Sequence, residues 1–184
     1  MSNIKATEKN IQTLLMNYTM QRAGHQIAIP NITPTGNTRL VGWECDLFTI
    51  GASGYSNEYE IKLNRADYDR DEKKEKIVLI SSAYENNKTI KNHQSAFTMP
   101  NNFYYVTYQF EIQPPVWAGW IYVQEVERSN HFTLSLEVKK LAPKLHGRKM
   151  GEGDMKYIAR LLSYRLEHAY QRAHSYILNK DGLT

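Results

Sequence analysis

The chain has 184 residues, a formal net charge of +4, 41% hydrophobic residues and 23% charged residues. This composition is typical of a folded globular chain and excludes the low hydrophobicity of a disordered one. The length fits a single domain over residues 1–184. The single cysteine, Cys45, excludes an intramolecular disulfide and a zinc site built on paired cysteines.

Localisation and partner class follow from the same numbers. No stretch approaches the ~20 apolar residues of a membrane-spanning helix, and the first residues lack the charged-then-apolar layout of a signal peptide. We therefore expect a cytoplasmic protein with no membrane partner. The isoelectric point of about 9.0 favours polyanions such as nucleic acid, although a solubilising surface accounts for it equally well.

Apolar periodicity predicts the secondary structure along the chain. In order, the expected elements are a helix from Thr7 to about Arg22, a strand over 25–32, a hairpin of Trp43–Ile50 and Tyr55–Leu63, a charged helix from Asn64 to about Ser82, strands over 102–108, 117–126 and 132–138, and a long helix from about Glu152 to Leu178. This order predicts an α/β (α+β) fold in which helices pack against one mixed sheet.

The ends and the charge pattern of two helices carry further expectations. Thr7 can cap the first helix and Gly24 can end it. Asn64 and Asp67 stand at the spacing of a capping box at the start of the charged helix. Two acid-first pairs four residues apart favour one continuous charged helix: Asp69 with Lys73, and Glu72 with Lys76.

Charged residues interrupt the apolar runs of the hairpin. Asp46 lies on its first strand, and Glu58, Glu60 and Lys62 alternate along its second, although Asp, Glu and Lys are depleted in strands. Because side chains alternate at period two, the three residues of the second strand point to one face, and Tyr59 with its odd-numbered neighbours points to the other. The hairpin therefore predicts one polar face and one packed face.

The length of the hairpin turn decides whether these charges meet. A turn with an odd number of residues, or with a bulge, places Asp46 across from Glu60 and Glu44 across from Lys62, whereas an even turn places Asp46 across from Tyr59. The glycines of Gly-Ala-Ser-Gly make a three- or five-residue turn easy to build. We expect the odd turn.

Two carboxylates at close range repel each other unless a proton or a cation intervenes. Mg²⁺ is bound in proteins by one or two carboxylates together with water and substrate phosphate, which matches Asp46 and Glu60. Lys62, on the same face as Glu60, could orient the attacking water or neutralise charge on the phosphate. The pattern points to phosphodiester hydrolysis.

Asp46, thirteen intervening residues and Glu60-Ile61-Lys62, between two helices, resemble the PD-(D/E)XK nuclease superfamily. The runs EYEIKLNRADYDRDEKK, NNFYYVTY, WAGWIYV and KKLAPKLH are similar to MmcB-like DNA-repair proteins and related phage-type nucleases. Cys45 stands where the superfamily's nominal proline would be.

The resemblance implies a fold and a set of roles. The fold is a restriction-endonuclease-like αβββαβ core over about 7–126, extended by a C-terminal strand and helix over about 132–179. Asp46 and Glu60 would bind Mg²⁺ or Mn²⁺, the Ile61 carbonyl would be a possible third ligand, and Lys62 would be the catalytic lysine. Glu8, on the apolar face of the first helix, would support the metal, or alternatively only favour the helix start.

Other residues are candidates for supporting roles. Glu44 is either an acid behind the metal ligands or the salt-bridge partner of Lys62. Basic residues that flank the site or lie on a loop are candidates for contacts with DNA phosphates: Arg65, Arg70, Lys73, Lys74, Lys144, His146 and Arg148.

The function expected from the sequence is a Mg²⁺-dependent deoxyribonuclease, in DNA repair, recombination or phage DNA processing. One alternative is a non-catalytic nucleic-acid-binding or regulatory protein that retains the nuclease fold. Another is a junction resolvase, which would need a homodimer to cut two strands symmetrically, with the long final helix as the natural interface. A surface hairpin held by salt bridges is the plainest reading of the charges.

Overall fold

The computed structural model describes residues 6–32, 43–85, 99–128 and 131–180. The chain divides into two compact units, residues 1–149 and 150–184. The second contains one long helix, α4 (Glu152–Lys180). In the described parts of the chain, no helix combines the length and the apolar character needed to cross a membrane.

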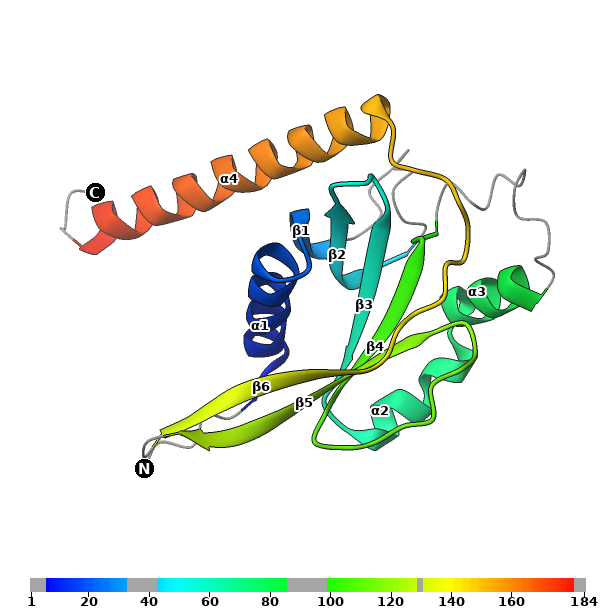
Figure 1. Ribbon diagram of the computed structural model, residues 1–184. Helices are drawn as coiled ribbons and strands as arrows, with labels where there is room; N and C mark the ends of the chain where they lie inside the picture. Colours follow the sequence, from blue (N-terminus) through cyan, green and yellow to red (C-terminus); the bar gives the residue numbers. More distant parts are fainter. Residues whose placement is uncertain (1–5, 33–42, 86–98, 129–130, 181–184) are drawn as a thin grey trace. The chain divides into compact units, whose positions relative to one another are not determined.

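The first unit is built on one open, mixed six-stranded sheet (Figure 1). Its elements are α1 (Glu8–Gln21), β1 (His25–Ile32), β2 (Cys45–Gly51), β3 (Ser56–Lys62), α2 (Arg65–Asp69), the 3₁₀ turn η1 (Asp71–Lys73), α3 (Glu75–Glu85), β4 (Asn102–Tyr108), β5 (Gly119–Arg128) and β6 (His131–Lys140). The strands lie in sequence order; β3–β4 and β4–β5 are parallel, and the other neighbours are antiparallel.

The predicted α+β architecture and order of elements are confirmed at this level. β6, the strand expected in a C-terminal extension, pairs with β5 along its length and belongs to the main sheet. The boundary between the two compact units falls after residue 149. Long antiparallel pairing satisfies the backbone groups of both strands, so β6 forms part of the sheet.

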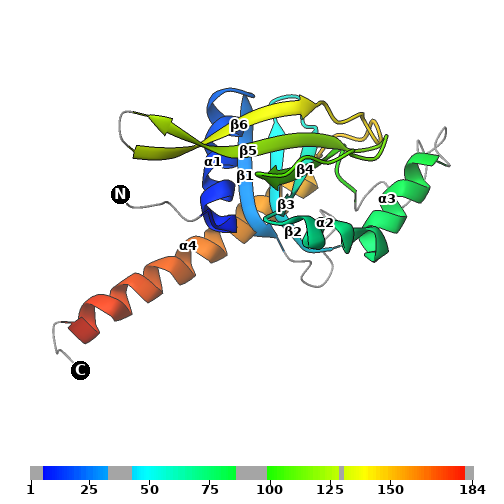
Figure 2. The same ribbon diagram turned by 90° about the horizontal axis from the view of Figure 1, so that it is seen from below.

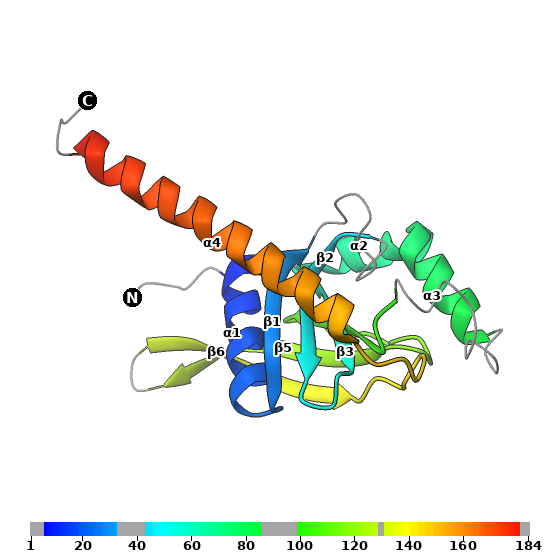
Figure 3. The ribbon, with the colours of Figure 1, turned by 90° about the horizontal axis from the view of Figure 1, so that it is seen from above.

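Helices cover both faces of the sheet. Figures 2 and 3, which view the molecule from opposite directions, place α1 on one side of the strands and α3 on the other. On the α1 side, Ile11 and Leu15 pack in one buried cluster with Tyr59 and Ile61 of β3. On the α3 side, the buried cluster centres on Ile77, Ile80, Phe103, Tyr105 and Trp117. Each face of β3 therefore meets a different helical layer.

The predicted ends of α1 are confirmed. The Thr7 hydroxyl accepts a hydrogen bond from the backbone N–H of Asn10 at 3.2 Å, which satisfies one of the unpaired donors of the first turn. Gly24, two residues after the C-cap, has φ +67°, a backbone conformation that glycine adopts without steric cost.

The prediction of a single charged helix from Asn64 to Ser82 is wrong, because the helix is interrupted twice along this segment. Asn64 does cap the first piece, since its side chain accepts from the N–H of Asp67 at 2.9 Å. The chain then passes through the turn η1 and through Lys74, whose ψ of 134° is extended rather than helical. The break turns Asp71, 1% exposed, toward β3, a direction that a continuous helix would not have given it.

The hairpin has the odd turn that the sequence predicted. Leu47 pairs with Tyr59, and Ile50 pairs with Ser56. Gly51 N–H donates to the Tyr55 carbonyl at 2.9 Å, so that three residues remain in the turn, the last of them Gly54 with φ +80°. If this register is extended by one residue beyond the Leu47–Tyr59 pair, Asp46 lies level with Glu60.

Candidate functional site

Asp46 and Glu60 line one pocket of about 290 Å³ at the end of the hairpin away from its turn. The other residues of its wall are Trp43, Glu44, Lys74 and Lys76. The β2–β3 ladder pairing ends at Leu47 and Tyr59. Beyond it, Ile61 N–H donates to the Asp46 carboxylate at 2.7 Å, so a side chain takes the place of a strand carbonyl. The two strands therefore separate where the two acids lie.

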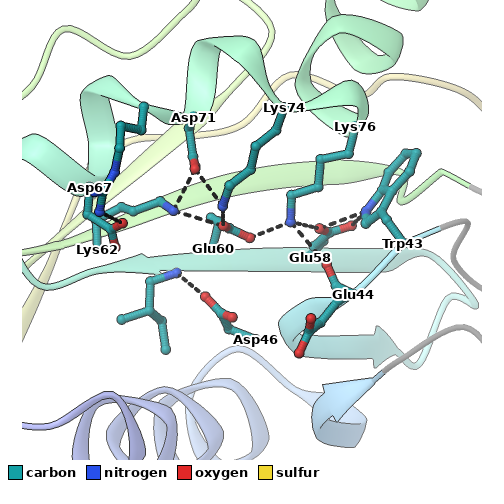
Figure 4. Close-up of polar contacts among 12 residues, drawn as sticks. Trp43, Glu44, Asp46, Glu58, Glu60, Lys62, Asp67, Asp71, Lys74 and Lys76 are labelled. Atoms are coloured by element: carbon teal, nitrogen blue, oxygen red, sulfur yellow. Dashed lines mark hydrogen bonds and ion pairs between the residues drawn. The ribbon is translucent and has the colours of Figure 1, made fainter.

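The polar face of β3 is buried beneath the segment from α2 to α3. Glu58, Glu60 and Lys62 are 0%, 4% and 2% exposed. Figure 4 shows their side chains meeting those of Asp71, Lys74 and Lys76. The prediction that these three β3 residues share a face is confirmed. They are packed rather than solvated, so a surface hairpin laced with salt bridges does not describe them.

Glu60 lies between three lysines. Its Oε1 atom is 2.9 Å from Lys62 Nζ and 3.1 Å from Lys74 Nζ, and its Oε2 atom pairs with Lys76. Burial alone would raise the pKa of Glu60, but the positive charges of Lys76 and Lys62 outweigh it and lower the pKa to about 2. Glu60 is therefore a carboxylate at any physiological pH.

Lys76 links the two glutamates of β3. Its Nζ atom lies 3.2 Å from Glu58 Oε1, pairs with Glu60 and donates to the Glu44 carbonyl at 3.1 Å. Burial would lower the pKa of Lys76, but the two carboxylates raise it well above its usual range. Trp43 completes the partners of Glu58, since its indole N–H lies 3.0 and 2.9 Å from the two oxygens. Lys76 is thus held by buried polar contacts on the β3 side of α3.

Asp46 has the opposite electrostatic environment. Burial, followed by the negative charge of Glu60, raises the pKa of Asp46 to about 7, and the Ile61 hydrogen bond offsets this only in part. Its carboxylate faces the pocket shared with Glu60 without a lysine of its own among the ion pairs of the described residues. A carboxylate in this setting favours binding of a proton or a cation.

Asp71 is a member of the site that the sequence did not reveal. Its Oδ1 atom lies 2.8 Å from Lys62 Nζ and 2.6 Å from Lys74 Nζ. Its Oδ2 atom is buried and has no hydrogen-bond partner within the described part of the chain. Lys62 is thus held between Glu60 and Asp71, and its ammonium group is fixed on both sides.

Glu8 lies near the site without lining the pocket. Gln12, one turn along α1, donates from Nε2 to the Glu8 carboxylate at 3.1 Å and to the Asp46 carbonyl at 3.0 Å. The negative charge of Glu8 contributes to the raised pKa of Asp46. Gln12, buried at 5% exposure, connects α1 to the site and was not foreseen; its place on the stripe of Ile11 and Leu15 was the available signal.

Glu44 and Ile61 also lie at the site. Glu44 is exposed on the pocket wall, and its carbonyl accepts from Lys76. Lys62 pairs with Glu60 and Asp71 among the described residues, so the predicted Glu44–Lys62 pair is not formed. Ile61 contributes its N–H to Asp46 and its side chain to the α1 core.

The carboxylate oxygens of the pocket are the type of ligand that a hard divalent cation prefers. The pocket wall carries the acids Glu44, Asp46 and Glu60 and the lysines Lys74 and Lys76. Glu58, Asp71 and Lys62 form ion pairs with these residues. Within the described residues, no group of three or more His, Cys, Asp or Glu side chains is arranged to hold a metal. A cation would therefore rely on the two carboxylates together with water or phosphate.

The predicted DNA-contacting residues fall into two groups. Arg65 at the start of α2 and Arg70 just after its end are exposed and pair with Asp69 and Asp67, respectively. Lys73 is exposed on η1. Lys74 belongs to the pocket itself. The second group follows β6, where the Lys144 ammonium lies over the Tyr55 ring.

His146 does not fit its predicted role as a phosphate contact. It is 7% exposed. Its Nε2 atom lies 2.9 Å from the Met99 carbonyl, and its Nδ1 atom lies 3.2 Å from both Asn101 Nδ2 and the Arg148 N–H. Burial lowers the pKa of His146, so the ring is a neutral hydrogen-bonding residue of the interior.

Comparison with known proteins shows only a likeness of fold. No family model matches the chain, and no curated protein matches it. Among solved structures, it is similar to SPO1766, a protein of unknown function from Silicibacter pomeroyi, with 12% identity over 92% of each chain and a TM-score of 0.52. This likeness extends over nearly the whole chain and agrees with the mixed α+β fold.

The unequal pKa values of the two acids predict how stability depends on pH in metal-free protein. The pKa of Asp46 is raised, so its burial increasingly destabilises the fold as pH rises from about 4 to about 7. The pKa of Glu60 is lowered, so its contribution is present above about 4.5 and is lost as pH falls toward 2. We expect Asp46→Asn to gain stability over the wild type by on the order of 1–3 kcal/mol, most of it appearing between pH 4.5 and 7.

Thermal or urea unfolding in EDTA across pH 4.5–8 measures this difference. Glu44→Gln is the matched control, because it removes a negative charge from an exposed acid on the same pocket wall. A difference between Asp46→Asn and the wild type that stays flat with pH would show that Asp46 is not held in a destabilising position.

Proposed function

We propose that the protein is a Mg²⁺- or Mn²⁺-dependent nuclease that hydrolyses phosphodiester bonds in DNA. The observation that carries this proposal is the placement of Asp46 and Glu60, from two separating strands, on one pocket wall, with the Lys62 ammonium 2.9 Å from Glu60. The restriction-endonuclease-like core, formed by α1 to β4, is part of the proposal.

Each residue has a defined task in this reaction. Asp46 and Glu60 would hold the metal ion, with the Ile61 carbonyl as a third ligand; when bound, the ion would supply a more acidic water and neutralise charge on the phosphate. Lys62 places a fixed positive charge beside the scissile phosphate, where negative charge develops. Asp71 keeps Lys62 in position through the 2.8 Å contact.

The lysines that pair with Glu60 each have a second carboxylate partner. Lys62 and Lys74 each also contact Asp71, and Lys76 also contacts Glu58. Each ammonium would therefore keep one carboxylate partner if Glu60 bound a cation, which would avoid the large cost of an unpaired buried charge. Asp46 needs no such exchange, because among the described residues its carboxylate accepts a hydrogen bond from the Ile61 backbone N–H and forms no ion pair with a lysine.

A nuclease assay tests the proposal directly. Purified protein is incubated with supercoiled plasmid, linear duplex, single-stranded and branched DNA in EDTA, Mg²⁺ or Mn²⁺. We expect cleavage only with the metal ions, and products with 5′-phosphate and 3′-hydroxyl ends. Absence of cleavage of every substrate with both metals, by protein whose fold is verified by circular dichroism, would contradict the proposal.

A non-catalytic DNA-binding protein is the second candidate, and the three lysines around Glu60 favour it, because they already neutralise one proposed ligand. A working metal site stabilises the folded state on cation binding by mass action. The melting temperature should therefore rise with Mg²⁺ or Mn²⁺ concentration for the nuclease and stay constant for the non-catalytic protein.

A further inference from the structure

The segment from Lys144 to Lys149 lacks regular secondary structure, yet it is firmly attached to the sheet. Asn101, 0% exposed, accepts from the Leu145 N–H at 2.7 Å, and its Nδ2 atom donates to the carbonyls of His146 at 3.0 Å and Arg148 at 2.7 Å. Buried polar networks of this kind rigidify what they connect. The segment is thus fixed by a side chain more than forty residues away.

The same asparagine is tied to the start of β3. Its side-chain oxygen accepts from Ser56 N–H at 2.8 Å, and its N–H donates to the Ser56 carbonyl at 3.0 Å. Ser56 directly follows Tyr55, the last residue before the strand. Asn101 therefore holds the basic segment in a set position beside the hairpin.

Two lysines of the segment meet the ring of Tyr55. The Lys144 ammonium lies 3.3 Å from the ring centroid and the Lys149 ammonium lies 5.3 Å from it, both within cation–π range. Both side chains are exposed, and neither forms an ion pair with a carboxylate among the described residues. Two positive charges are thus held in place, and no carboxylate in the described part of the chain neutralises them.

We propose that Tyr55, Lys144 and Lys149 form a second DNA-binding site, which takes the phosphate backbone of a duplex arm outside the pocket of Asp46 and Glu60. The identity of the polymer rests on the proposed function. The phosphate backbone is favoured over a stacked base because the Lys144 ammonium already occupies the ring face that a base would need. The Tyr55 ring orients the two lysines, and the lysines bind the phosphates.

The distance from the pocket sets the length of DNA required. Tyr55 precedes Glu60 by five residues, which at about 3.3 Å per residue is about 17 Å along β3. Successive phosphates on one strand of a duplex lie about 3.4 Å apart along the axis. An arm of about five base pairs therefore spans the two sites, and a 20-base-pair duplex reaches both.

Fluorescence anisotropy with a labelled 20-base-pair duplex in EDTA tests this site without cleavage. Two neutralised phosphates predict that the double variant Lys144→Ala/Lys149→Ala lowers the magnitude of the slope of log affinity against log salt by about 1.8. The loss of affinity relative to wild type should shrink about tenfold between 50 and 200 mM salt. Tyr55→Leu should weaken binding, and Tyr55→Phe, which keeps the ring, should restore it.

Lys139→Ala is the matched control, because Lys139 also lies over a tyrosine, Tyr122, but is neutralised by Glu137 at 2.6 Å; it should bind as the wild type does. An unchanged slope for the double variant, or no duplex binding by the wild type, overturns this second site. A wild type that binds through these lysines but does not cleave leaves the second site standing and contradicts the nuclease. Cleavage by the wild type, with unchanged binding by the double variant, supports the nuclease and contradicts the second site.

Discussion

Asp46→Asn is expected to lower metal-dependent DNA cleavage by at least about a thousandfold while the metal-free protein becomes no less stable. The asparagine side-chain oxygen can still accept from Ile61 N–H, which the Asp46 carboxylate does at 2.7 Å. What disappears is the negative charge that a divalent ion needs and that burial and Glu60 make unfavourable in its absence. Loss of function with unchanged or higher stability is typical of a residue kept for binding rather than for folding.

The measurement combines cleavage kinetics with Mn²⁺ binding by calorimetry. Lys62→Met should lose cleavage to a similar degree, because the variant lacks the positive charge beside the phosphate, but it should still bind Mn²⁺. Glu8→Gln keeps the hydrogen bond from Gln12 and should retain most activity, since Glu8 does not line the pocket. Wild-type rates for both Asp46→Asn and Lys62→Met would rule out the assigned chemistry.

The hairpin shows how much local sequence can predict. The positions of Gly51 and Gly54 made a three-residue turn easy, and that turn fixes the parity of every pair along β2 and β3. The prediction that Asp46 lies level with Glu60 followed from these few residues, because strand register depends on the turn next to it. No distant contact had to be known.

The partners of Glu60 depend on contacts that local sequence does not encode. The charged helix was predicted as continuous because acid–base pairs four residues apart support a helix. The structure instead interrupts it at Lys74, and Asp71 and Lys76 turn inward. One signal was available: Lys76 stands next to Ile77 and four residues before Ile80, on the apolar stripe of α3, which indicates a buried lysine with a partner.

His146 failed as a prediction for a similar reason. Its charged neighbours suggested a surface residue. Its burial depends instead on hydrogen bonds to Asn101, which is distant from it in the sequence. The same network explains why Lys144 stays exposed while the next residue, Leu145, is 1% exposed. In an irregular segment, the burial of each side chain depends on which backbone groups bond to the sheet. These bonds can be identified only from the three-dimensional structure.

Lysines neutralise Glu58, Glu60 and Asp71 of the site when no cation is bound. This arrangement would protect the fold against the repulsion of Asp46, Glu58 and Glu60, which would otherwise oppose packing of α3 on the sheet. It also makes the site dependent on Lys76, which contacts both glutamates of β3. Lys76 is therefore the residue at which the stability of the whole site can be tested.

Lys76→Met is expected to destabilise the metal-free protein by about 3–5 kcal/mol, because it leaves Glu58, 0% exposed, without an ion-pair partner among the described residues. Methionine keeps a similar length and apolar stem, so lost packing contributes little. The Trp43 indole N–H remains with Glu58 but carries no full charge. Urea unfolding at pH 7.5 in EDTA measures the change.

Two further variants separate charge from general damage to the segment. Lys73→Met, at an exposed lysine on η1, should change stability by less than about 0.5 kcal/mol. Adding Glu58→Gln to Lys76→Met should recover part of the loss, because it removes the buried charge that Lys76 neutralised, so the two effects are not additive. If Lys76→Met is as stable as Lys73→Met, or if Glu58→Gln makes it worse by its full single-variant cost, the buried pair does not hold α3 on the sheet.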